Sequence, residues 1–157
     1  MSKVKIRLAT PRDVIVLMQM MRLYLQEQPM GHPEINESHT IRSLLQVIDM
    51  TGAYVAVADK KLIGSIGVMV DKYPWNQEYR FIYDEWFYVL PQYRKGTNAA
   101  GLLLEAVKKL SDSHNMPFVF SVNSGIDRRI DRYLGMSGFR YAGGIHIRAS
   151  KGAEANG

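Results

Sequence analysis

The spacing of hydrophobic residues changes character within the first fifty residues. Val4, Ile6 and Leu8 alternate with charged residues, and this period of two predicts a β-strand with one face in water. Hydrophobic residues then recur every three or four positions in residues 14–25 and again in residues 41–48. That spacing predicts two amphipathic helices, each of which buries one stripe of side chains.

Local signals mark the boundaries of these two helices. Thr10 can cap the first helix, Pro11 suits its first turn, and Asp13 lies at the positive end of the helix dipole. A cluster of proline and glycine then interrupts the helical pattern and predicts a loop over residues 28–36.

The middle of the chain has the pattern of three strands. Residues 53–58 and 62–70 are rich in β-branched residues, and the short polar turn between them suits a hairpin. After a loop over residues 72–78, an aromatic strand is expected over residues 79–90. Pro91 ends this strand, because proline cannot donate a hydrogen bond to a sheet.

The last third of the chain predicts two helices and several short strands. Residues 99–110 have the most regular helical pattern of the sequence, and residues 117–122 have the composition of a buried strand. Ser124 opens a last helix, and short closing strands are expected at residues 139–142 and 145–149.

Length and composition fit one globular domain. The chain has 157 residues, of which 46% are hydrophobic, and no repeat or linker divides it. We therefore expect a single domain over residues 1–150 and a flexible tail over residues 151–157. No hydrophobic run reaches the ~18 residues of a membrane span, and the N-terminus lacks the apolar block of a signal peptide, so that a cytoplasmic location without membrane contact is expected.

Residue types restrict the chemistry further. The chain has no cysteine, which excludes disulfides, a thiol nucleophile and thiolate metal sites. Its four histidines are scattered without metal-ligand spacing, so that no metal is expected. A net charge of +5 favours an anionic ligand, either a nucleotide cofactor or nucleic acid. Arginines gather in the last third of the chain, but no nucleic-acid-binding motif accompanies them, and a solvated basic face is the simpler interpretation.

A candidate anion site lies between the aromatic strand and the helix at residues 99–110. Strand, turn and helix start follow one another there, so that free backbone N–H groups and the positive end of the helix dipole meet at the loop. Arg94 and Lys95 add positive charge just before the helix. Gly96 and the small residues 99–101 let a ligand approach the backbone closely.

The stretch VLPQYRKGTNAAGLLL resembles a motif of the GNAT superfamily of N-acetyltransferases. The family pattern is a hydrophobic strand ending in V-x-P-x-x-R, then Q/R-x-x-G-x-G/A and a leucine-rich helix. The positions of this chain that match it are Val89, Pro91, Arg94, Ala99, Leu102 and Leu103. Thr97 replaces the first glycine of the signature, and the adjacent Gly96 can supply the backbone freedom. The later stretch RYLGMSGF is similar to a second family feature, and the resemblance extends over nearly the whole chain.

The resemblance implies a fold, an activity and a cofactor site. The implied fold is a mixed α/β (α+β) domain whose mostly antiparallel central sheet has six to seven strands and about four flanking helices, with a splay between strands four and five. The implied activity transfers acetyl from acetyl-CoA to a primary amine by direct attack in a ternary complex. The cofactor would lie against Val89, Leu90, Arg94, Lys95, Gly96, Thr97, Asn98, Ala99, Ala100 and Asn123.

Acetyl transfer to an amine requires a base, an oxyanion donor and an acid. Glu85 and the adjacent Asp84 are the candidate bases, since a carboxylate among aromatic residues can have a raised pKa. A backbone N–H of Val89 or Leu90 would stabilise the oxyanion. Tyr133 is the candidate acid, although the usual family position for this tyrosine holds a leucine here.

Other interpretations of these residues stay open at the level of sequence. The carboxylate can be a paired residue at the edge of a cleft, Tyr133 can be a packing residue, and Asn123 can stabilise a turn. The acidic residues of segment 24–50 would attract a cationic acceptor. A homodimer is compatible with the family. A GNAT-like binding or structural module without strong activity is the alternative function.

Overall fold

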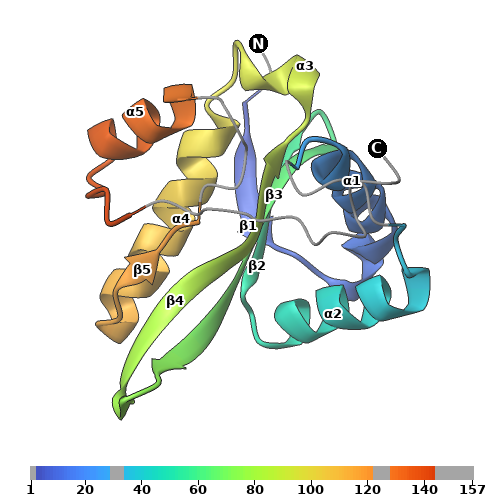
Figure 1. Ribbon diagram of the computed structural model, residues 1–157. Helices are drawn as coiled ribbons and strands as arrows, with labels where there is room; N and C mark the ends of the chain where they lie inside the picture. Colours follow the sequence, from blue (N-terminus) through green and yellow to red (C-terminus); the bar gives the residue numbers. More distant parts are fainter. Residues whose placement is uncertain (1–2, 29–33, 122–127, 144–157) are drawn as a thin grey trace, which may run out of the picture.

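The computed structural model describes residues 3–28, 34–121 and 128–143. Strands β1 to β5 follow their sequence order in one sheet, and all neighbours are antiparallel except the parallel pair β4 and β5. Helices α1 and α2 cover one face of the sheet, while α4 and α5 lie on the other side (Figure 1). The elements are β1 (Lys5–Leu8), η1 (Pro11–Asp13), α1 (Val14–Gln26), α2 (Glu37–Asp49), β2 (Ala53–Ala58), β3 (Lys61–Tyr73), β4 (Asn76–Val89), α3 (Pro91–Arg94), α4 (Ala99–His114), β5 (Phe118–Val119) and α5 (Arg128–Met136).

The hydrophobic core has two layers, one on each face of the sheet. Leu17 and Leu44 bring α1 and α2 against Val55 and Trp86 of the sheet. On the opposite face, α4 inserts its buried stripe, which includes Leu103, Leu104 and Val107, against Ile63, Ile66 and Ile82. The helical spacings in the sequence therefore identify the buried faces of α1, α2 and α4 correctly.

The described residues contain five strands, fewer than the six to seven that the sequence predicts. Residues 139–142 form no strand, because the N–H of Phe139 donates to the carbonyl of Leu134 (3.0 Å) and closes the end of α5. The other predicted closing strand, residues 145–149, lies outside the described residues. The segment 72–78 is mostly strand, whereas the sequence predicts a loop, because its polar residues belong to an exposed two-stranded ribbon.

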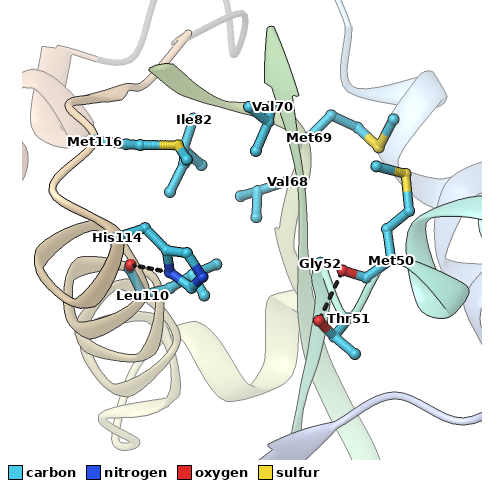
Figure 2. A pocket seen from close by; sticks show the side chains of 10 residues that line it. All are labelled: Met50, Thr51, Gly52, Val68, Met69, Val70, Ile82, Leu110, His114 and Met116. Carbon is cyan, nitrogen blue, oxygen red and sulfur yellow. Dashed lines mark hydrogen bonds between the residues drawn. The ribbon is translucent and has the colours of Figure 1, made fainter. Parts of the chain in front are cut away.

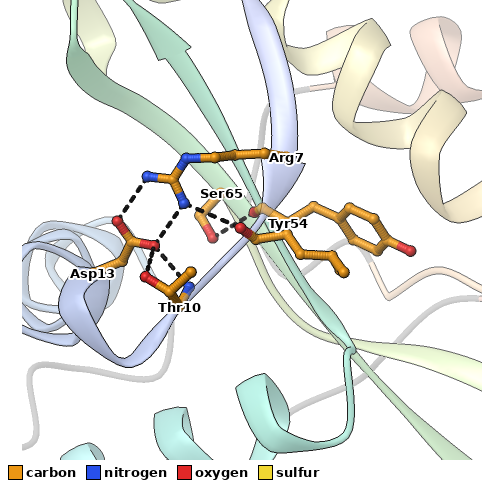
Figure 3. Close-up of polar contacts among 6 residues, drawn as sticks. Arg7, Thr10, Asp13, Tyr54 and Ser65 are labelled. Atoms are coloured by element: carbon orange, nitrogen blue, oxygen red, sulfur yellow. Dashed lines mark hydrogen bonds and ion pairs between the residues drawn. The ribbon is translucent and has the colours of Figure 1, made fainter.

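A polar contact joins the first strand to the first helix (Figure 3). Both carboxylate oxygens of Asp13 accept hydrogen bonds from the Arg7 guanidinium, at 2.8 and 2.9 Å, and one also accepts from the N–H of Thr10 at 2.8 Å. These donors favour the ionised carboxylate, with Arg7 contributing most, and lower the pKa of Asp13 to about 2. The Thr10-Pro11-Arg12-Asp13 start signal predicted from sequence is thus confirmed.

A β-bulge shifts the register between β3 and β4 beside the predicted catalytic carboxylates. Gly67 is opposite Trp86 but the next residue, Val68, is opposite Asp84, so that Glu85 is an extra residue on β4. Side chains of β4 before and after Glu85 therefore do not alternate regularly between the two faces of the sheet. This bulge determines where the side chains of the candidate site point.

Candidate active site

Strands β4 and β5 pair over a short stretch of the described residues. Ile82 and Tyr83 pair with Phe118 and Val119, and these are the only paired positions of the two strands within the described residues. The next link is a side chain: Asp84 Oδ1 accepts a hydrogen bond from the N–H of Ser121 at 2.6 Å. Beyond Tyr83 no backbone pairing joins β4 to the described residues from Phe118 to Ser121, and we call this end of the pairing, beside Asp84, the opening. Residues 122–127 lie outside the described residues, so that the splay stays a prediction.

Asp84 lies at the apex of this opening and is partly buried. Loss of hydration disfavours its charged form and raises the pKa of Asp84 to about 6, although the hydrogen bond from Ser121 acts in the opposite direction. A carboxylate with a pKa of about 6 is mostly ionised at neutral pH, so that it can accept a proton from an amine.

Glu85, the base named first from sequence, is exposed. It lies at the bulge. The pKa of Tyr83 is raised first by burial and second by a hydrogen bond from the protonated phenol to the Glu85 carboxylate. Tyr24 of α1 also has a raised pKa, caused first by burial and then by the charges of Asp84 and Glu85. Both carboxylates therefore act electrostatically on the space between α1 and β4.

The end of β4 offers one backbone donor to this opening. The N–H of Leu90 donates to the carbonyl of Ile63 on β3 (2.9 Å), so that it is occupied by the sheet. Successive N–H groups of a strand point to opposite edges, and the N–H of Val89 therefore points away from β3. Of the two donors considered from sequence, only Val89 has its N–H directed toward the opening.

The loop before α4 is built as the sequence suggested, with Gly96 in the place of the missing glycine. Gly96 has a positive φ of 88°, whereas Thr97 is not among the residues with positive φ. The Thr97 hydroxyl donates to the carbonyl of Tyr93 (2.6 Å) and lies 3.4 Å from the N–H of Ala99. Thr97 thus stabilises the turn and the helix start rather than straining them.

The first turn of α4 presents backbone donors. The first regular helical hydrogen bond there runs from the N–H of Leu102 to the carbonyl of Asn98 (3.0 Å). The N–H groups from Ala99 to Gly101 precede it and have no carbonyl acceptor within the helix, as at any helix N-terminus. Together with exposed Lys95 and Asn98 they are the candidate anion site that the sequence predicts.

Arg94 contacts the end of β4 and the end of α1 and does not extend toward the start of α4. Its Nε donates to the carbonyl of Val89 (2.8 Å), and one Nη donates to Glu27 at the end of α1 (2.8 Å). The guanidinium also stacks 4.9 Å from the ring centre of Tyr88, whose hydroxyl donates to the same Glu27 oxygen at 2.6 Å. Burial opposes the charge of Glu27, but the two hydrogen bonds outweigh it and lower its pKa.

Burial and the bond to the Glu27 carboxylate raise the pKa of Tyr88 to about 12, so that this phenol stays protonated. Sequence reasoning did not identify Glu27 as part of the site. The only signal was its place in an acidic segment, because its two partners lie 61 and 67 residues away.

The hydroxyl of Tyr133 lies against the beginning of α4. A Cβ added at Gly101 would lie 2.7 Å from Tyr133 Oη, so that only glycine leaves room for the phenol in this position. Tyr133 is half-buried and packs on the α4 layer of the core, beside the buried Leu134. The one-residue offset from the family position still brings this hydroxyl to the anion site. Asn123 lies outside the described residues.

A separate cavity of about 110 Å³ lies near the opposite end of α4 (Figure 2). Its lining is mainly apolar, and the single histidine, His114, contacts the carbonyl of Leu110 through Nδ1 at 3.1 Å. No group of acidic or histidine side chains in the described residues could hold a metal ion. None of the described helices has the length and apolar character needed to cross a bilayer.

Comparisons with solved structures give many matches over nearly the full chain. A predicted acetyltransferase from Clostridium acetobutylicum, solved with acetyl-CoA, has a TM-score of 0.72 at 15% identity and covers 94% of this chain and 96% of its own. The aminoglycoside N-acetyltransferase AAC(6')-Iy in complex with CoA has a TM-score of 0.70 at 15% identity, covering 96% and 97%. A ribosomal-protein-alanine N-acetyltransferase from Brucella melitensis biovar Abortus has a TM-score of 0.67 at 16% identity, covering 94% and 100%.

Comparisons of sequence alone are negative, since no protein-family model and no curated protein sequence matches. The three-dimensional similarity nevertheless covers 94–96% of this chain. The chain therefore has the fold of the GNAT acetyltransferases, which confirms the mixed fold with a mostly antiparallel sheet that the resemblance implied, but not its six to seven strands.

Proposed function

We propose that this protein is an N-acetyltransferase that moves an acetyl group from acetyl-CoA to a primary amine in a ternary complex. The observation that carries the proposal is the position of a partly buried carboxylate, Asp84, at the opening between β4 and β5, on the strand that leads into an anion-binding helix start. Two of the structures with this fold hold acetyl-CoA or CoA, which supports the same cofactor here.

The anion site fits the cofactor. The N–H groups at the start of α4 and the Lys95 ammonium would hold the pyrophosphate, since together they provide several donors without burying an unpaired charge. Arg94 would hold the loop in shape through Val89 and Glu27. The cofactor, when bound, supplies an acetyl thioester, and the chain's own residues supply proton transfer and charge stabilisation.

Three groups of the chain would act on the reacting atoms. Asp84 takes a proton from the amine through water molecules, because five strand positions, about 15 Å, separate it from Val89, and the nitrogen lone pair can then attack the thioester carbon. The N–H of Val89 donates to the carbonyl oxygen as it gains negative charge. Tyr133 donates a proton to the sulfur as the carbon–sulfur bond breaks. Glu85 is the alternative base, and its exposure favours a role in attracting the acceptor.

The acidic residues between the end of α1 and β4 favour a cationic acceptor. Glu27, Asp84 and Glu85 all lie where the end of α1 faces β4, since both Tyr24 and Tyr88 interact with members of this group. A protonated amine would be attracted there before it loses its proton. Related folds include enzymes named for aminoglycosides and for a ribosomal-protein alanine, and both kinds of amine belong in the substrate screen.

Calorimetric titration with acetyl-CoA tests the cofactor, and thiol release with polyamines, aminoglycosides and lysine peptides tests turnover. Arg94→Ala should weaken acetyl-CoA binding. Lys109→Ala, which removes one exposed cation farther along α4, is the matched control and should leave binding unchanged. Failure of the intact protein to bind acetyl-CoA would remove the proposal and leave only a GNAT-like fold. Binding without turnover of any amine would support the binding-module alternative.

A further inference from the structure

The outer half of the β3–β4 hairpin extends beyond the rest of the sheet (Figure 1). β2 pairs with β3 only as far as Gly67, and β5 pairs with β4 only at Ile82 and Tyr83. Residues 69–73 and 76–81 therefore form a ribbon of two strands. Such a ribbon is marginally stable by itself, because it lacks a third strand or a helix that would cover it.

This ribbon exposes aromatic side chains. Trp75 at the turn is 83% exposed, Tyr79 is 51% exposed and Tyr73 is 46% exposed. The Tyr73 ring contacts both of the others edge to face, with ring centres 5.4 Å from Trp75 and 6.1 Å from Tyr79. The three rings come from β3, the turn and β4, and only Tyr79 belongs to the open edge of β4. Exposed aromatic surface beside an open strand edge favours association.

The charges on the open edge of β4 suit a second copy of the same strand. The sequence there is N-Q-E-Y-R-F, from Asn76 to Phe81, and it has an acid and a base on either side of Tyr79. Two such strands running antiparallel with Tyr79 opposite Tyr79 place Glu78 of each opposite Arg80 of the other. Within the described residues neither Glu78 nor Arg80 forms an ion pair, and Arg80 is directly opposite another cation, Lys72.

We propose that the protein forms a twofold dimer in which the β4 edges of two copies pair antiparallel, centred on Tyr79. The ladder would extend over residues 77–81, because β5 occupies the same edge from Ile82 onward. Each copy contributes Glu78 to the partner's Arg80, which relieves the repulsion between Arg80 and Lys72. The pairing joins the two sheets through their hairpins and covers the edge that a monomer leaves open.

A charge-reversal pair tests this arrangement. The wild-type mass is measured by light scattering and sedimentation over a range of concentrations, with a dimer expected. Glu78→Arg or Arg80→Glu alone should weaken association by at least ~10-fold, because like charges then face each other twice. Mixing the two variants should restore a dimer, since every facing pair is again of opposite sign. The double variant Glu78→Arg with Arg80→Glu should also restore it.

A cross-link locates the contact independently. Because the chain has no cysteine, Tyr79→Cys introduces a single thiol at the twofold axis, where opposed strand residues lie within disulfide range. Mild oxidation should give a covalent dimer, while Lys109→Cys, exposed on α4, should give no covalent dimer. A monomeric wild type at all concentrations overturns the proposal. So does a dimer that both single charge variants keep, or one that oxidation of the Tyr79→Cys variant fails to trap.

Discussion

The proposed cofactor loop and the proposed catalytic carboxylates lie within a few residues of each other in sequence, yet they are built in different ways. The turn from Tyr93 to Ala99 is closed by short-range contacts, as in the bond from Thr97 to Tyr93, and Arg94 ties it to α1 through Glu27. The carboxylates take their properties from distant segments, because Asp84 is held by Ser121, 37 residues away. The turn should therefore tolerate exchange of Thr97, whereas exchange of Arg94 or Asp84 should have large effects.

The same difference appears in how each region departs from a regular pattern. In the loop, Gly96 adopts the positive φ that the family signature assigns to the next position, and the turn is kept. On β4, the bulge at Glu85 interrupts the alternation and separates the environments of two adjacent acids. In the loop, a shift of one residue leaves the backbone N–H groups in place. On β4, the same shift changes which carboxylate, Asp84 or Glu85, is partly buried.

Replacement of Asp84 should have the largest effect. Asp84→Asn keeps the shape and the acceptor for the Ser121 N–H, but it cannot take a proton, so that kcat should fall by ~10²–10⁴-fold. In the wild type, kcat/KM should decrease as the pH falls through about 6, where Asp84 becomes protonated, and this limb should vanish in the variant. Steady-state rates from pH 5 to 9 measure both effects.

Glu85→Gln is the matched control, because it makes the same charge change one residue away. It should keep the limb near pH 6 and lose at most a few-fold in rate, as expected for an exposed residue that attracts the acceptor. If Glu85→Gln instead abolishes the limb while Asp84→Asn keeps it, Glu85 is the base, as the sequence first suggested.

The Asp84→Asn variant, although less active, should be more stable than the wild type at high pH. The pKa of Asp84 is raised in the folded state, so that the folded protein binds this proton more tightly than the unfolded chain does. Its favourable contribution is present below the unfolded pKa near 4 and is lost as the pH rises through about 6. Asp84→Asn should therefore raise Tm at pH 8 and change it little at pH 4. An equal shift of Tm at both values would exclude ionisation as the cause.

Arg94 should give the second largest effect, on cofactor affinity rather than on kcat. Arg94→Ala removes the hydrogen bond to the Val89 carbonyl and the contacts with Glu27 and Tyr88. The affinity for acetyl-CoA should fall by ~10–100-fold, the range expected for hydrogen bonds of a charged group. Glu27→Gln keeps the Val89 contact and an oxygen that can accept from Tyr88, and it removes the charge of an exposed ion pair, so that it should cost ~5-fold or less. Equal losses from both variants would place the main function of Arg94 in its contact with Glu27.

A smaller effect is expected from Gly101→Ala, which tests Tyr133 without touching it. The new methyl group would lie 2.7 Å from Tyr133 Oη and must displace the phenol, so that kcat should fall by ~10-fold. Tyr133→Phe removes the clashing oxygen, and adding Gly101→Ala to it should cause no further loss. Alanine also favours the helix, so the variant should not be less stable. Full activity in both single variants would make Tyr133 a packing residue.

The sequence predicted the parts of the molecule that depend on local pattern. The buried stripes of α1, α2 and α4, the turn at Gly96 and the helix start at Ala99 follow from spacing and residue type within short windows. The sequence could not predict the bulge at Glu85, because a register shift is determined by pairing with β3. The sequence could not predict the Glu27–Arg94 contact or the bond from the Leu90 N–H to Ile63 either, because each joins residues that are far apart in the chain.

The smallest effect should come from Thr97, and it is the sharpest test of the tolerance ascribed to the loop. Thr97→Val keeps the shape but loses the hydroxyl contacts to the Tyr93 carbonyl and the Ala99 N–H, at a cost of about 1 kcal/mol, or ~5-fold in acetyl-CoA affinity. Thr97→Ser retains both contacts and should bind as the wild type does. Thr97→Gly restores the family residue but leaves the helix start without its hydroxyl, so that it should resemble Thr97→Val in calorimetry. Tighter binding by Thr97→Gly than by the wild type would show that the hydroxyl does not compensate for the missing glycine.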